Sequence, residues 1–139
     1  MTLREFLLTH APSAEWEEIC KPLRNGIITD RDERKIYKRT HLPAVWPSVI
    51  LEGGSDAEHI IGQSGLICID IDAKDNPHKS LEEMADAIES DERTIAFLES
   101  CGGAGFAVFM GCSGLDGFEE TFRTVQEDFR ERGITIDRQ

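Results

Sequence analysis

Apolar and polar positions alternate most clearly at residues 65–72, where an apolar strand pattern ends in two aspartates. Side chains at i and i+2 of a strand point to the same face, so Asp70 and Asp72 are expected to lie side by side, with isoleucines on the other face. Two carboxylates on one face repel each other, and a divalent cation would offset that repulsion. The alternative is that the strand ends there and both aspartates are solvated turn residues.

Regular elements follow this strand. The expected elements are a strand at 65–72, a helix at 80–88 that begins with a Ser-x-x-Glu capping box, strands at 94–99 and 106–110, a helix at 116–132 and a strand that begins at 134. This order is β-α-β-β-α-β, which is the ferredoxin-like or RRM-like arrangement of an α+β fold. Right-handed crossovers then place the first strand between the third and the fourth.

The first sixty residues predict an N-terminal α/β extension packed on that core. Helices are expected at 13–24 and 30–40, and a strand at 45–51 contains Pro47, which favours a sheet edge. Residues 1–139 are therefore interpreted as a single domain, with an extension at 1–60 and the core at 65–139. Because the chain stops two residues after Asp137, we expect either a fragment of a longer protein or a reduced domain.

Composition is that of a globular protein, with 40% hydrophobic and 30% charged residues in 139. No apolar run approaches the length of a membrane span, so a cytoplasmic protein without membrane contact is expected. The four cysteines form no Cys-x-x-Cys pair, which favours thiols over disulfides or a metal finger. A net charge of −12 argues against broad electrostatic binding of nucleic acid. One basic cluster, at 31–39, is either a solvated helix face or a contact for phosphate.

The expected topology brings three features to one patch of the sheet. The end of the first strand lies beside the glycine-rich turn at 100–105 and beside the start of the last strand, which carries Asp137. Three aspartates suit one or two Mg²⁺ or Mn²⁺ ions, because these ions prefer carboxylate oxygens. Glycines in the turn would let backbone amides approach a phosphate closely.

These residues resemble the motifs of a known family. Residues 65–72 are similar to the first motif of the archaeo-eukaryotic primases (primase-polymerases), 100–108 to the second and 133–137 to the third, and the nearest resemblance is to the VirE N-terminal-like branch. The resemblance implies a primase-like domain with a divalent-metal-dependent nucleotidyltransferase activity in the DNA replication of a mobile element or phage. It implies a nucleoside triphosphate and a DNA template as partners, and a helicase or another domain of a longer chain.

The resemblance also assigns roles to residues. It implies that Asp70, Asp72 and Asp137 are catalytic and hold Mg²⁺ or Mn²⁺. It implies that the triphosphate is held by six residues, namely Ser100, Gly102, Gly103, Gly105, Lys38 and Arg39. One departure is Ala107, which stands where this family usually has a histidine that contacts the triphosphate. Two other interpretations therefore stay open: a catalytically inactive module that binds nucleotide or nucleic acid, and an acidic protein-interaction domain.

Overall fold

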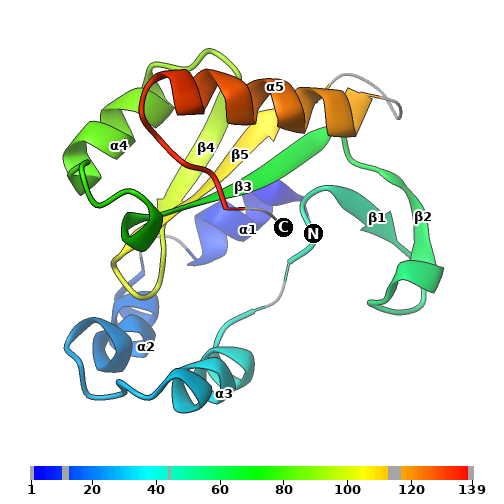
Figure 1. Cartoon of the computed structure of the whole chain (residues 1–139). Helices are drawn as coiled ribbons and strands as arrows, with labels where there is room; N and C mark the ends of the chain where they lie inside the picture. Colours follow the sequence, from blue (N-terminus) through cyan, green and yellow to red (C-terminus); the bar gives the residue numbers. More distant parts are fainter. Residues whose placement is uncertain (1, 11–12, 44, 113–116, 138–139) are drawn as a thin grey trace. The chain divides into compact units, whose positions relative to one another are not determined.

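The computed structural model describes residues 2–10, 13–43, 45–112 and 117–137, and these form a mixed α+β structure with five α-helices and two antiparallel sheets (Figure 1). The contacts divide the chain into two units. The first unit comprises Met1–Val45 with Cys101–Gly103, and the second comprises Trp46–Ser100 with Ala104–Gln139. The α+β class expected from the sequence is confirmed, and the unit boundary lies nearer the N-terminus than the expected end of the extension at residue 60.

The first unit contains three helices, α1 (Leu3–His10), α2 (Ala14–Arg24) and α3 (Arg31–His41). The expected helices at 13–24 and 30–40 are confirmed, whereas α1 was not expected. Helices α2 and α3 both begin at side-chain caps. The side chain of Ser13 accepts a hydrogen bond from the amide of Trp16, and that of Asp30 accepts from two amides of the first turn of α3. A small core between them is made of Cys20, Leu23 and Cys101.

The second unit is built on a three-stranded antiparallel sheet in the order β3-β5-β4. Its strands are β3 (Leu66–Asp72), β4 (Thr94–Glu99) and β5 (Gly105–Gly111), and two helices, α4 (Leu81–Glu89) and α5 (Gly117–Glu131), cover one face (Figure 1). The core lies between this face and the helices. It includes Ile67, Ile69, Ile71, Met84, Ile88, Val108, Met110, Val125 and Phe129, all fully buried.

A two-stranded hairpin precedes this sheet in the second unit. β1 (Val49–Leu51) pairs antiparallel with β2 (Ile60–Gln63), and a short 3₁₀ helix, η1 (Ala57–His59), connects them. The strand expected at 45–51 is therefore shorter than predicted and begins after Pro47. β2 was not expected, because the sequence around 56–61 carried only a weak helical signal.

Residues 134–137 do not form the expected fourth strand. The backbone NH and CO of Thr135 bond to the side-chain amide of Asn76 instead of to a neighbouring strand. The segment still runs beside β3, since the amide of Asp137 donates to the carbonyl of Asp70 at 3.0 Å. The prediction of a complete βαββαβ core is thus wrong at its last element, and the specific RRM-like arrangement does not follow from the described strands.

Within the described ranges, no helix is both long and apolar enough to cross a membrane. No disulfide joins the four cysteines, which agrees with their interpretation as thiols.

A buried acidic side chain ties the start of β4 to the end of α5. Asp91 is 5% exposed and accepts from Arg93 at 2.7 Å and from Arg132 at 2.9 Å, while Arg93 also pairs with Asp128. The hydrogen bonds from Arg93 lower the pKa of Asp91 to about 2, against the effect of burial. A carboxyl group whose pKa is lower in the folded state stabilises the fold above its unfolded pKa, and the stabilisation is lost as the pH falls through the folded value.

We therefore expect Asp91→Asn to lower the free energy of unfolding by about 2 kcal/mol at neutral pH, because the two arginines lose their anionic partner. The difference from the wild type should shrink as the pH falls from about 4 to about 2, where Asp91 itself becomes protonated. Urea unfolding at neutral pH and at a pH of about 2 measures this difference, with Asp86→Asn on the exposed side of α4 as the control. An equal loss at both pH values would contradict an electrostatic role for Asp91.

Candidate metal centre

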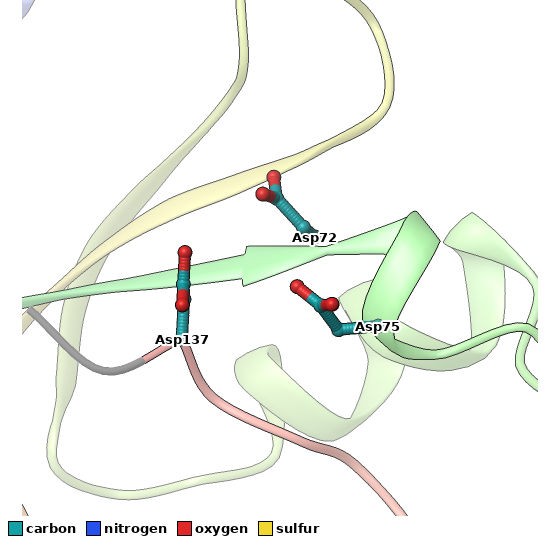
Figure 2. Close-up of side chains that lie close together, drawn as sticks. All are labelled: Asp72, Asp75 and Asp137. Carbon is teal, nitrogen blue, oxygen red and sulfur yellow. The ribbon is translucent and has the colours of Figure 1, made fainter.

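Three carboxylates from three separate segments meet at the end of β3. Asp72 is the last residue of that strand, Asp75 ends the following 3₁₀ helix, η2 (Ala73–Asp75), and Asp137 comes from the segment after α5. One oxygen of each lies within 4.8 Å of the others, and Figure 2 shows the three side chains around one space. Asp72 is half-buried and the other two are exposed. This arrangement is called the Asp72–Asp75–Asp137 cluster below.

The strand alternation of β3 sets the direction of Asp72. Ile67, Ile69 and Ile71 are fully buried, so the alternate positions, including Asp70 and Asp72, face away from the core. The expectation that the two aspartates share one face is confirmed.

Gly105 allows β5 to pass directly beside Asp72. A Cβ atom at this position would lie 2.4 Å from the carbonyl oxygen of Ile71 and 2.8 Å from Oδ1 of Asp72. Both distances are far below van der Waals contact, so only glycine fits here without a shift of the backbone. The sequence assigned Gly105 to phosphate binding, and in the structure its close neighbours are the residues of β3.

The side chain of Asn76 fixes the third carboxylate. Asn76 is 4% exposed, and its amide nitrogen donates to the carbonyls of Asp72 at 2.8 Å and Thr135 at 2.9 Å. Its carbonyl oxygen accepts from the amide of Thr135 at 2.6 Å. These bonds hold the segment that carries Asp137 against the turn that carries Asp75. Asn76 is therefore a positioning residue for the cluster.

One cation accompanies the carboxylates. The ammonium nitrogen of Lys74 lies 2.9 Å from Oδ2 of Asp72 and 3.8 Å from Oδ2 of Asp75. The hydrogen bond to Asp72, followed by the charges of Asp72, Asp75 and Asp137, raises the pKa of Lys74. The charges of all three aspartates thus act on the ammonium group of Lys74. Three negative charges and one positive charge leave a formal balance of −2, which matches a single divalent cation.

Asp70 lies near the cluster but outside it. It is exposed on β3, pairs in register with Ala107 of β5, and its carbonyl accepts from the amide of Asp137. Burial, and then the charge of Asp70, raise the pKa of the Cys68 thiol to about 12, as expected for neighbours on one face. The sequence grouped Asp70 with Asp72 and Asp137, whereas the structure groups Asp75 with them. Asp75 follows Asp72 by three positions, and this spacing in the sequence could have indicated that the two carboxylates lie close together.

The residues expected to hold a triphosphate are divided between the two units. Ser100 and Gly105 belong to the second unit, where the hydroxyl of Ser100 accepts from the amide of Ala104 at 3.3 Å and closes the turn. Gly102 and Gly103 belong to the first unit.

Lys38 and Arg39 lie on α3 in the first unit, and both are exposed. Burial and the neighbouring Cys20 raise the pKa of the Cys101 thiol to about 12. The positive charge of Lys38 opposes that rise.

Replacing Asn76 should loosen the cluster. We expect Asn76→Ala to lower the free energy of unfolding by about 2 kcal/mol, because part-buried backbone groups of Asp72 and Thr135 lose their partners. We also expect faster hydrogen exchange at the amides of Thr135 and Asp137. Urea unfolding and amide exchange measure these effects, with Asn25→Ala, an exposed amide side chain, as the control. Unchanged exchange in the 134–137 segment would contradict the positioning role.

Comparison with curated proteins and with solved structures finds no significant match. The family model of the BT4734-like N-terminal domain, in contrast, matches residues 37–130. This match corrects the resemblance to the VirE N-terminal-like domain and to the archaeo-eukaryotic primases, because the family found is a different one. It covers the strand 65–72 and the glycine-rich turn and stops before the segment 133–137, which had been compared with a third primase motif. Since the matched range spans more than half of the sequence, the chain belongs to the BT4734-like N-terminal domain family.

Proposed function

We propose that this domain binds one divalent cation, Mg²⁺ or Mn²⁺, at the Asp72–Asp75–Asp137 cluster and, through it, the phosphates of a nucleotide. The observation that carries the proposal is the convergence of three carboxylates within 4.8 Å, offset by a single lysine. Like charges at this separation repel, and a hard cation with oxygen ligands is the partner that turns this repulsion into binding.

The exposure of the cluster suits magnesium or manganese better than a structural ion. Mg²⁺ keeps several waters and is usually held by one or two carboxylates together with substrate phosphates. Asp75 and Asp137 are exposed, so a bound cation would keep positions open toward solvent. A cation at such a place would supply charge neutralisation for phosphoryl or nucleotidyl transfer.

The chain itself would hold and orient this group. Asp72 is fixed by β3 and by the close passage of Gly105, while Asp137 is fixed by the buried Asn76. Lys74 gives the carboxylates a counter-charge when no metal is bound. The nucleotidyl transfer expected from the sequence stays a prediction. An assay of metal-dependent incorporation of a nucleotide would test it.

A second function, nucleotide binding without catalysis, is favoured by one observation. Ala107 lies opposite Asp70 in the strand register, so β5 offers only a methyl group beside Asp70 and no side chain that could donate or accept a proton there. The two functions are separated by supplying primed template, Mn²⁺ and nucleoside triphosphates to the purified chain. Extension of the primer supports transfer, and nucleotide binding without extension supports the second function.

The proposed ligand set predicts a ranking of variants. We expect Asp72→Asn, Asp75→Asn and Asp137→Asn each to weaken Mn²⁺ binding by roughly tenfold or more, because each removes one negative charge about 4 Å from the ion. Asp70→Asn should have a smaller effect, since Asp70 is not part of the cluster. Titration calorimetry or the EPR signal of Mn²⁺ measures the affinity, and Asp86→Asn is the control. Wild-type binding by all three cluster variants would contradict the proposed site.

Lys74 predicts a change in the opposite direction. We expect Lys74→Gln to strengthen Mn²⁺ binding by roughly three- to tenfold at low salt, because a positive charge that competes with the ion is removed. The gain should decrease as salt is added. The same titration measures it, with Lys79→Gln as the charge-matched control. Weaker binding by Lys74→Gln would show that the lysine supports the cluster more than it competes with a cation.

A further inference from the structure

A groove borders the proposed metal site in the second unit. It has a volume of about 360 Å³, within the range of small-ligand sites. Asp75 and Asp137 line it together with Thr135, so it is continuous with the Asp72–Asp75–Asp137 cluster. On another side, α5 contributes Gln126 and Arg130, which are one helical turn apart on the same face.

Arg130 is exposed in the last turn of α5. Two other arginines of this unit have partners, since Arg93 and Arg132 both pair with the buried Asp91. Among the described residues, no hydrogen bond or ion pair is found for the guanidinium of Arg130 or for the amide of Gln126. A cation and a neutral hydrogen-bonding group therefore line the same groove as two carboxylates.

The groove thus combines opposite requirements. Its acidic end repels anions unless a cation is bound there, whereas Arg130 favours an anion. A phosphate group carried by a divalent cation satisfies both ends at once, because the cation binds carboxylates and the guanidinium fork matches phosphate oxygens. Gln126 offers both a donor and an acceptor beside them.

We infer that this groove binds the phosphate chain of a nucleoside triphosphate as its divalent-cation complex, with Arg130 contacting a phosphate and Gln126 lying beside it. The inference rests on the proposed function, since the cation at the Asp72–Asp75–Asp137 cluster is part of the ligand. It adds a residue that recognises the phosphate directly. The resemblance described above gave the cationic contacts to Lys38 and Arg39, whereas in this groove the cation comes from α5.

The test separates binding of the metal from binding of the nucleotide. Calorimetric titrations are made first with Mn²⁺ alone and then with Mn²⁺–ATP, on the wild type, Arg130→Gln and Arg130→Lys. Arg123→Gln is the matched control, because it removes the same charge from an exposed position of α5 that does not line the groove. Circular dichroism verifies that each variant is folded.

We expect Arg130→Gln to bind Mn²⁺ within about twofold of the wild type and to bind Mn²⁺–ATP at least about tenfold more weakly, since a charge-assisted contact is lost. Arg130→Lys should fall between them, because lysine keeps the charge without the fork. Inorganic tripolyphosphate with Mn²⁺ should lose as much affinity as the nucleotide if Arg130 contacts phosphate. An equal loss in Arg123→Gln, or the same decrease for Mn²⁺ alone as for Mn²⁺–ATP, would overturn the contact.

The outcomes distinguish the two proposals. Wild-type affinity of Arg130→Gln for Mn²⁺–ATP, with Mn²⁺ binding intact, overturns the inference and leaves the metal site standing. Failure of the wild type to bind Mn²⁺ overturns the proposed function itself. Mn²⁺ binding by the wild type without any binding of Mn²⁺–ATP overturns the assignment of the groove.

Discussion

The side chain of Asn76 is the contact on which the candidate site depends. It is buried, and its amide bonds the carbonyl of Asp72 at the end of β3 and both backbone groups of Thr135 in the segment after α5. Two segments about sixty positions apart in the sequence are thereby held together at the point where Asp72, Asp75 and Asp137 converge. A buried amide that lost these bonds would leave several polar groups unsatisfied, which makes the junction costly to open.

The second constraint is the alternation of β3, and its strength follows from magnitudes. Burying one isoleucine side chain contributes roughly 1.5–3 kcal/mol, and Ile67, Ile69 and Ile71 are all fully buried. Repulsion between two surface carboxylates about 4 Å apart costs only about 1 kcal/mol in water. The apolar face therefore determines the orientation of the strand, and the carboxylates are held on the other face despite their repulsion. This is how the fold keeps a charge cluster that would not assemble on its own.

Family membership and local chemistry give different kinds of information here. The match to the BT4734-like N-terminal domain identifies relatives of residues 37–130 and assigns no reaction. The functional argument therefore stands on the carboxylates, on Lys74 and on the groove beside them. The primase resemblance failed because its motifs are short: an Asp-x-Asp at the end of a strand and a glycine-rich turn are each common, and Gly105 has a steric role against Ile71 and Asp72 that requires glycine without any ligand.

Local patterns in the sequence determined most of the second unit. The capping box at Ser80, the strand 94–99, the alternation in β3 and the apolar stripe of α5 depend on neighbours in the chain, and each was found where it was expected. The expected first residue of the helix at 116–132 lies outside the described residues. Two elements of the second unit were predicted wrongly. β2 was missed because it is short, and the last strand was expected but its backbone groups bond to distant partners instead.

The sequence by itself therefore determined that Asp70 and Asp72 share one face of a strand and that Asp137 returns near its end. Only the tertiary structure decided which carboxylates meet. The turn after β3 folds into η2 and brings Asp75 to Asp72, while the side chain of Asn76 replaces the partner strand of Thr135 and fixes Asp137. Both depend on contacts between residues far apart in the chain or on the exact path of a turn, and strand periodicity carries no information about either.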